Sequence, residues 1–491
     1  MSPWLGAILL VAGFVVLIQL LGVIKKSHNV IRIALHSLKV IGSSRLSDEQ
    51  KESKLQKNSK RLFGLFFVLA LGSAIAILIP IGILWLGDYL GLISLSAVLA
   101  TTISPVFILV SSILMVALIF LKSRVNVDSD TSQTNSYSQI DQILHQIAFN
   151  TYTAQVTLAN LEDRLLNQKL TDCKNDKPVF ITALPRAGTT LLLECCASSP
   201  EFSAHCYRDM PFVMIPYLWN RFSLTFQRQI KSTERAHGDG MQISPDSHEA
   251  LEEVVWKTFW QHHYHRDRLI PWDYEVNQEF KRFFDSHLRK IILLRRQNSQ
   301  DFTRYVSKNN ANIARIKILC QLYPNATIII PFRDPLHHAS SLLQQHLNFL
   351  QIHQEDRFAS EYMQAIGHYD FGKNLRPIDF DGWYDERSSR DPKSLAFWLE
   401  YWLASYKHLL KNDAEQINFF DYDELCRNPQ NELKRLAAVI ESNNPQALVL
   451  ALSKIRQPRP RKINSQSLPA SLMQEVNLIY ADLRDCALIR W

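Results

Sequence analysis

A short loop between two apolar runs contains the residue types that bind a phosphate group. The sequence PVFITALPRAGTTLLLE, residues 178–194, places Arg186, Gly188, Thr189 and Thr190 between a predicted strand and a predicted helix. The backbone N–H groups of such a loop and of the following helix start bind phosphate. A nucleoside triphosphatase would carry a lysine directly after the glycine, where this chain has Thr189. The loop is therefore suited to one phosphate group, and we expect Arg186 on its other side, where a leaving bridging oxygen develops charge.

The string PRAGTTLL resembles the loop that binds the 5′-phosphosulfate group of 3′-phosphoadenosine 5′-phosphosulfate (PAPS) in the sulfotransferase family. Members of that family carry Lys or Arg at the position of Arg186, and the Arg form is similar to the tyrosylprotein and related bacterial branch. A structural strand–turn–helix with a chance match is the alternative. The resemblance implies that the donor is bound by the loop residues Pro185, Arg186, Ala187, Gly188, Thr189, Thr190 and Leu191.

A second motif, IIIPFRDPLHHASSLLQQH, places Arg333 after an apolar run and Ser341 eight residues later in a predicted helix. The 3′-phosphate site of the sulfotransferase family resembles this arrangement, so the resemblance assigns Arg333 and Ser341 to that phosphate. The chemistry is suitable, because a phosphate dianion favours a guanidinium fork and a hydroxyl donor. The alternative is that Arg333 pairs with Asp334 and that Ser341 is an ordinary helix residue.

Sulfuryl transfer needs a base near the acceptor hydroxyl, and two residues compete for that role. Asp209 lies twenty-three residues after Arg186, close to the spacing at which several sulfotransferase branches place a carboxylate, and the neighbouring Arg208 would keep it ionised. His237, in the string ERAHGDG, is the second choice, since neutral histidine is an effective base near pH 7. The structural alternatives are an ion-paired aspartate and a tight turn at HGDG.

Two further basic segments resemble parts of the family's donor or acceptor site. Lys308 is expected at the end of a strand on the ligand side of the sheet, where the family has residues that contact donor or acceptor; a solvated helix start is the alternative. The late string RQPRPRKIN lies where the family's loop covers the 3′-phosphate, which points to Arg459 and Arg461, although the usual glycines are absent.

A tract rich in aromatic and imidazole groups contains Trp256, Trp260 and three histidines, His262, His263 and His265. Three histidines within four residues resemble a metal site, but no carboxylate or cysteine stands at ligand spacing. The tract is interpreted as an acceptor-binding wall or as core, and no metal site is predicted.

Strand-like and helix-like segments alternate in the part of the chain that carries these motifs. Strands are predicted at VFITAL, FTRYV, ATIIIPF and INFFDY, and helices at 189–198, 279–296, 310–323, 337–349 and 430–440. Nearly continuous apolar strands that alternate with helices indicate a parallel sheet covered on both faces. The predicted fold is therefore α/β with a P-loop-like strand–turn–helix, in a sulfotransferase domain over 177–491. A polar linker at 122–139 and an amphipathic helix within 140–176 precede it.

Two long parts of the first 121 residues are nearly free of charge: no charged residue precedes Lys25, and only Asp88 lies between Arg61 and Lys122. A helix of about 20 apolar residues crosses a hydrocarbon core of ~30 Å. A buried helical hairpin is the alternative for the last two of the three segments that meet this length: 4–24, 62–86 and 98–121. The segment 25–61 holds ten Lys or Arg against three acids, so the positive-inside rule places it, and the chain after the third span, on the cytoplasmic side.

Composition narrows the choice of partners. The net charge of +7 is explained by lipid-facing loops and an anionic ligand, and no aromatic-interleaved basic stripe favours nucleic acid. The seven cysteines have no zinc-type spacing. They are interpreted as unpaired thiols, which are typical of a reducing compartment.

Together these patterns predict a multi-pass membrane protein that transfers the sulfuryl group of PAPS, without a metal, to a hydroxyl or amine and releases adenosine 3′,5′-bisphosphate (PAP). The acceptor is a small molecule, a lipid or a glycan. A P-loop kinase-like phosphotransferase and a non-catalytic membrane scaffold are the alternatives. The sequence does not indicate an oligomeric state.

Overall fold

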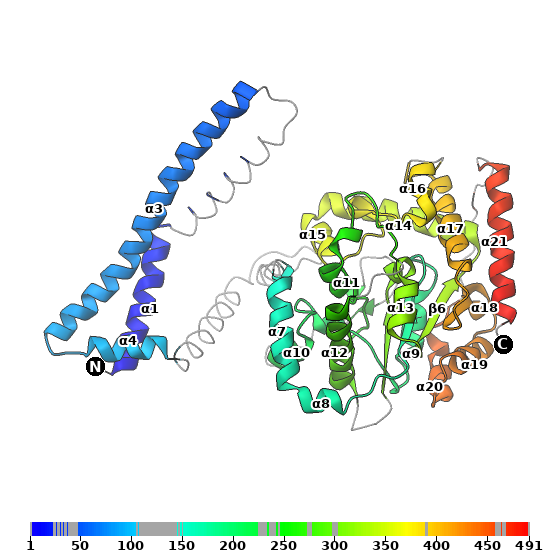
Figure 1. Cartoon of the computed structure of the whole chain (residues 1–491), viewed down its shortest axis with the longest axis horizontal. Coiled ribbons are helices and arrows are strands. Elements are labelled where there is room, and N and C mark those ends of the chain that lie inside the picture. The colour runs from blue at the N-terminus through cyan, green and yellow to red at the C-terminus, as the bar shows by residue number, and fades with distance from the viewer. Residues whose placement is uncertain are drawn as a thin grey trace. The chain divides into compact units, whose positions relative to one another are not determined.

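The protein is described here from a computed structural model of the chain (Figure 1). The described residues are 2–22, 26, 30, 33, 37, 48–104, 107, 145, 148–149, 151–223, 233–234, 242–243, 246–272, 277–296, 303–387, 391–456, 463 and 468–489. The chain divides into two compact units, Met1–Asn135 and Ser136–Trp491.

The N-terminal unit consists of helices α1 (Pro3–Leu20), α3 (Asp48–Tyr89) and α4 (Leu95–Ile103). Helix α1 packs against both α3 and α4. A small apolar core of this unit is formed by Ala7, Leu84, Val98 and Phe107. Most large side chains on the apolar half of α3 lie outside this small core, as Phe63, Leu71 and Leu78 do.

Helix α3 contains the one segment, Gln56–Tyr89, that is long and apolar enough to cross a membrane among the described residues. It includes the second predicted span, 62–86. The prediction of three spans is not supported: the apolar helix Pro3–Ile18 is shorter than a span requires, and of 98–121 the structure describes the last part of α4, Ser104 and Phe107. The predicted linker, 122–139, lies outside the described residues.

The C-terminal unit is built around a five-stranded sheet with the order β2-β5-β1-β6-β7. Every pair of neighbouring strands in it is parallel. The strands are β1 (Val179–Ile181), β2 (Phe202–Ser203), β5 (Arg304–Lys308), β6 (Thr327–Phe332) and β7 (Ile417–Asp421). Four of them are the predicted strands, and β2 is an addition of two residues. Two short strands, β3 (Thr233–Glu234) and β4 (Gln242–Ile243), form a separate antiparallel pair.

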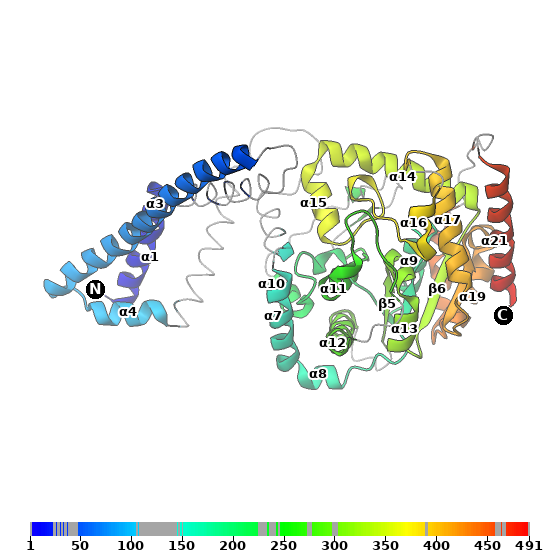
Figure 2. The same cartoon turned by 45° about the horizontal axis from the view of Figure 1, so that its top comes forward.

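Helices cover both faces of the sheet, as the apolar strands predict (Figures 1 and 2). Phe180 of β1 belongs to the large apolar core of the unit, whereas its neighbours Val179 and Ile181 belong to a second core on the opposite face. This alternation follows from the period of two of a strand. Burial on both faces explains why the strands are apolar throughout.

The helices of this unit largely agree with the predicted segments. The helix expected within 140–176 is divided at Leu166 into α7 and α8. The C-terminal helix packs against β7 and α17 (Figure 1). The helices are α7 (Tyr152–Leu165), α8 (Asn167–Thr171), α9 (Thr189–Cys196), α10 (Pro216–Ser223), α11 (Glu253–Phe259), α12 (Gln278–Arg295), α13 (Ile316–Leu322), α14 (Pro335–Glu355), α15 (Arg357–Ala365), α16 (Trp383–Glu386), α17 (Leu395–Leu410), α18 (Tyr422–Arg427), α19 (Pro429–Val439), α20 (Pro445–Val449) and α21 (Ala470–Ile489).

Candidate active site

The loop between β1 and α9 has two residues in the left-handed backbone region, Arg186 with φ 72° and Gly188 with φ 98°. A Cβ atom on Gly188 would lie 2.2 Å from the ring of Tyr422, so both the backbone conformation and the space require glycine. Arg186 carries a side chain in a conformation that costs about 1–2 kcal/mol for an L-residue. A strained backbone conformation of this kind persists only where neighbouring groups hold the loop in place.

Side chains from the neighbouring strand β6 and from helix α14 fix this loop. His338 Nε2 donates a hydrogen bond to the Pro185 carbonyl at 2.8 Å, and Arg333 Nη1 donates to the Arg186 carbonyl at 3.5 Å. Burial, together with the charge of Arg333, lowers the pKa of His338 to about 3. The imidazole is therefore neutral at physiological pH and carries its proton on Nε2, where it holds the loop.

The two predicted anion-binding groups lie together. Arg186 Nε donates to the Ser341 hydroxyl at 3.4 Å. The suggested pairing of Arg333 with Asp334 is not among the ion pairs of the described residues; instead the Asp334 carboxylate caps α14 by accepting from the His337 N–H at 2.8 Å. The Arg333 guanidinium lies over the Tyr422 ring, 5.1 Å from its centroid.

These residues fit the two ends of a bisphosphorylated nucleotide. Arg333 Nε is buried and has no hydrogen-bond acceptor among the described residues, so this strongly polar donor is available to an anion. Helix α9 begins at Thr189, directly after its N-cap Gly188, and the free N–H groups of its first turn point into the same loop. Strands β1 and β6 are neighbours in the sheet, so their carboxyl ends bring both groups to one edge.

Asp209, the first choice of base, is fully buried in a polar cluster. Its Oδ2 accepts from His205 Nδ1 and from the Cys206 N–H, both at 3.0 Å, and its other oxygen pairs with Arg295. Burial alone would raise the pKa of Asp209, but the hydrogen bond from His205 and the charge of Arg295 outweigh it and lower the pKa. This enclosed geometry favours a structural ion pair.

Arg208 does not support the ionised state of Asp209 as predicted, because its guanidinium pairs with Asp246 instead. Lys308 is the last residue of β5, in register with Ile181 of β1, and so lies at the ligand edge as expected. His237, Arg459 and Arg461 lie outside the described residues.

The aromatic tract belongs to the core. Trp256 and Trp260 are buried, and His263 stacks on Trp272 with ring centroids 4.3 Å apart. Within the described ranges, no group of three or more His, Cys, Asp or Glu side chains is placed to hold a metal ion.

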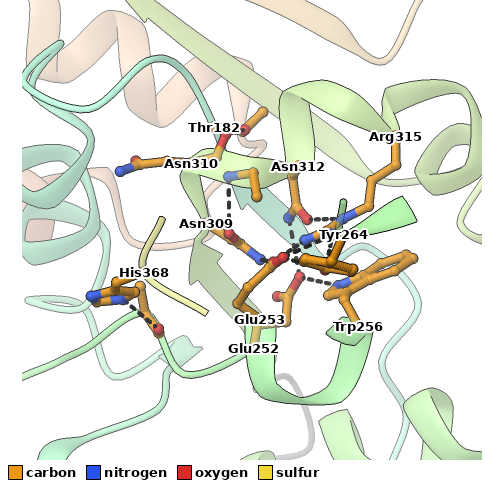
Figure 3. A network of polar contacts seen from close by, with 12 residues as sticks. Thr182, Glu252, Glu253, Trp256, Tyr264, Asn309, Asn310, Asn312, Arg315 and His368 are labelled. Carbon is orange, nitrogen blue, oxygen red and sulfur yellow. Dashed lines mark hydrogen bonds and ion pairs between the residues drawn. The ribbon is translucent and has the colours of Figure 1, made fainter. Parts of the chain in front are cut away.

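A buried ionic network beneath the site was not predicted from the sequence (Figure 3). The carboxylate of Glu253 pairs with Arg315, a residue that is fully buried, and accepts from Asn309 Nδ2 at 2.8 Å. Asn312 Nδ2 donates to the adjacent Glu252 at 3.0 Å. Burial by itself would lower the pKa of Arg315, but the charge of Glu253 outweighs it and raises the pKa. The guanidinium is therefore charged and anchors the segment that follows β5.

That segment carries Asn310, which contacts both the phosphate-binding loop and an acid. Asn310 Oδ1 accepts from the Thr189 hydroxyl at 3.3 Å, and its Nδ2 donates to Asp370 Oδ2 at 3.1 Å. The sequence analysis singled out Lys308 in the string SKNNAN but not Asn310, which follows it by two residues. No local pattern indicated Asp370, which is brought to the site by the fold.

Comparison with known proteins identifies the family of the chain. Residues 178–443, more than half of the chain, match the model of the sulfotransferase family. No curated protein matches the chain. Among solved structures, sulfotransferase STF9 from Mycobacterium avium is similar, with a TM-score of 0.39 and 12% identity over 73% of this chain and 98% of that chain. Sulfotransferase STF1 from Mycobacterium tuberculosis H37Rv has a TM-score of 0.32 and 13% identity, over 70% and 81%. The family match, which includes the loop after β1 and the arginine that follows β6, identifies the chain as a member of the sulfotransferase family.

Proposed function

We propose that this protein transfers the sulfuryl group of PAPS to a hydroxyl or amine of an acceptor while it is anchored to a membrane. The observation that carries the proposal is the contact of Arg186 with Ser341 at 3.4 Å, at the edge where Arg333 also reaches the loop. One donor molecule with a phosphosulfate and a 3′-phosphate matches this pair of adjoining anion-binding groups.

Each residue of the site has a role in this reaction. The loop N–H groups with Thr189 and Thr190 would hold the 5′-phosphosulfate, and Arg333 with Ser341 would hold the 3′-phosphate. Arg186 would neutralise the bridging oxygen as the sulfur–oxygen bond breaks. Arg459 and Arg461 are candidates for the loop that covers the 3′-phosphate. When bound, PAPS supplies an activated sulfuryl group, so the chemistry needs no metal from the protein.

The N-terminal unit supports the proposed membrane anchoring. The apolar half of α3 exposes Phe63, Leu71 and Leu78, which water solvates poorly and lipid accommodates. The ten basic residues of segment 25–61 precede the apolar half of α3 and favour the cytoplasmic side for that end of it. An enzyme at a membrane surface meets lipids and lipid-linked glycans, so these are the favoured acceptors, beside small molecules.

Ligand-induced stabilisation tests the donor assignment without knowledge of the acceptor. We expect PAP at a hundred times its dissociation constant to stabilise the purified full chain by about 2.7 kcal/mol, and ATP with Mg²⁺ to stabilise it far less. Transfer of ³⁵S from PAPS to components of a cell lysate should depend on the chain. Stabilisation by ATP with turnover to ADP would favour a kinase-like enzyme. No response to either nucleotide would favour a non-catalytic scaffold.

A further inference from the structure

Asp370 lies in a connection that is packed tightly beside the active site. The connection follows α15, and its Gly367 has φ 81°. A Cβ atom on Gly367 would lie 2.5 Å from Cγ of Glu253, the carboxylate of the buried ionic network. The His368 N–H donates to the Met363 carbonyl at 2.9 Å, which closes the turn. The connection that carries Asp370 is therefore packed against Glu253, whose carboxylate also holds Asn309, the neighbour of Asn310 (Figure 3).

A single side chain connects the Asp370 carboxylate with the phosphate-binding loop. Asn310 donates to Asp370 Oδ2 at 3.1 Å and accepts from the Thr189 hydroxyl at 3.3 Å. The backbone carbonyl of Asn310 accepts from the Thr182 hydroxyl at 3.4 Å, which ties the amide to the end of β1. In the part of the chain that is described, Asn310 is the one residue that donates a hydrogen bond to Asp370. Because a carboxylate has room for several hydrogen bonds and this one accepts a single bond from the described residues, it can still accept a proton.

A cavity lies between this carboxylate and the residue that precedes Arg186. Its volume is about 20 Å³, which is room for a group of the size of one water molecule. The cavity therefore suits a reacting hydroxyl or amine group rather than the body of an acceptor. Its lining includes Pro185, Leu269, Tyr369, Asp370, Arg376 and Tyr401.

The charges around Asp370 are suited to a proton acceptor. The groups that face it are His368, Lys308, Glu253 and the amide of Asn310. Burial raises the pKa of the Asp370 carboxyl, and Glu253 adds to that rise, while His368, Asn310 and Lys308 oppose it; the net pKa is raised. A base whose pKa lies nearer to neutral pH accepts a proton from a hydroxyl more effectively than an ordinary carboxylate.

We propose that Asp370 is the general base of the transfer and that the cavity beside Pro185 receives the acceptor's hydroxyl or amine. This inference rests on the proposed sulfuryl transfer from PAPS. It differs from the prediction for Asp209, because that carboxylate is enclosed by His205 and Arg295 and does not line this cavity.

The step balances with the groups present. The acceptor oxygen or nitrogen attacks sulfur, and a bond to sulfur forms as the bond between sulfur and the bridging oxygen of the 5′-phosphate breaks. The electron pair of the broken bond remains on PAP, next to Arg186. The proton of the acceptor group moves to the Asp370 carboxylate, which later returns it to water.

Substitution of Asp370 separates the loss of a base from the loss of donor binding. We expect Asp370→Asn to reduce transfer of ³⁵S from PAPS to a cell lysate by about a hundredfold or more, while its stabilisation by PAP stays within about twofold of the unchanged chain. Asp385→Asn is the matched control, since its carboxylate is exposed and pairs with Arg268 rather than with the loop residues, and we expect full transfer from it.

Formate rescue provides a readout that a structural role would not change. We expect Asp370→Ala, which leaves space and no carboxylate, to regain transfer at least about tenfold on addition of formate and none on addition of chloride. This variant also serves if Asp370→Asn fails to fold. Full transfer by either variant, or binding of PAP without formate rescue, would overturn the role of Asp370. Absence of transfer by the unchanged chain would overturn the proposed function itself.

Discussion

Arg186 and Ser341 contact each other through Nε and Oγ at 3.4 Å, although 155 residues separate them in the chain. The first lies on the loop after β1 and the second on α14, which follows β6. Parallel neighbouring strands end at the same edge of the sheet, so the contact is a direct consequence of the strand order. The residues that we assign to the bridging oxygen and to the 3′-phosphate therefore lie together at one edge of the sheet, which is the arrangement that the proposed donor requires.

Replacement of Arg186 by alanine is expected to reduce sulfuryl transfer by about a hundredfold or more and to change PAP affinity much less, because its charge is needed where negative charge develops. The measurement is ³⁵S transfer from PAPS beside PAP-induced stabilisation. Arg186→Gly is the matched control, since glycine relieves the φ of 72° and still removes the guanidinium. Both variants should lose transfer equally. If Arg186→Ala kept most of its transfer, the leaving-group role would be wrong.

Replacement of Arg333 by alanine is expected to weaken PAP binding by about 10- to 100-fold and to abolish the preference for PAP over adenosine 5′-monophosphate, which lacks the 3′-phosphate. Titration of both nucleotides against the variant measures this preference. Arg357→Ala is the control, because that side chain is 91% exposed and pairs only with Glu361 on its own helix among the described residues. A variant that still preferred PAP would show that another group binds the 3′-phosphate.

Sequence patterns were sufficient for four of the five strands of the sheet and for the motifs that we propose bind the donor. Strands β1 and β6 are buried on both faces, so their apolar runs were visible without their partners. Gly188 and Arg333 stand in local motifs at the ends of these strands. Motifs of this kind can be recognised in a single sequence because the chemistry needs their residues at a fixed spacing.

The acceptor side could not be predicted in the same way. Glu253 and Arg315 form an ion pair although they are 62 positions apart in the chain. The periodicity of apolar residues in a sequence carries no information about such a pair. Asp370 reaches the loop only because Asn310 is held by this network. Asp209 has the expected spacing from Arg186, but spacing alone does not reveal that His205 and Arg295 enclose its carboxylate.

The apolar half of α3 is expected to hold the chain in a membrane. Introduction of arginine at Leu71 and Leu78 together should release the chain into the soluble fraction after an alkaline wash of membranes, because arginine at the centre of a span costs ~2.5–3.5 kcal/mol. Leu165→Arg on α7 is the control, since its side chain is similarly exposed, at 68%, in the other unit. Retention of the doubly substituted chain in the membrane would show that α3 is not the anchor.

Acid is expected to destabilise the catalytic unit through its buried histidines. Burial, together with His205 and Lys290, lowers the pKa of His287 well below its usual value. The unfolded chain then binds more protons below about pH 6.5, so stability falls as pH decreases, by about 1.4 kcal/mol per pH unit for each such histidine. His287→Asn should therefore weaken the pH dependence of the free energy of unfolding by one such contribution, as measured by unfolding curves between about pH 7 and pH 5. The exposed His265→Asn is the control and should leave the slope unchanged; an equal slope in His287→Asn would contradict the assignment.

Two glycine substitutions separate backbone strain from loss of space at the donor loop. Gly188 and Gly382 both have positive φ, at 98° and 81°, so alanine at either position costs about 1–2 kcal/mol of stability. A Cβ on Gly382 meets nothing within 4 Å, whereas one on Gly188 lies 2.2 Å from the Tyr422 ring, over which Arg333 lies. Gly188→Ala should therefore also weaken PAP binding by about tenfold or more, and Gly382→Ala should leave it unchanged. Equal PAP affinity in the two variants, measured by titration, would mean that the close approach of Tyr422 does not shape the donor site.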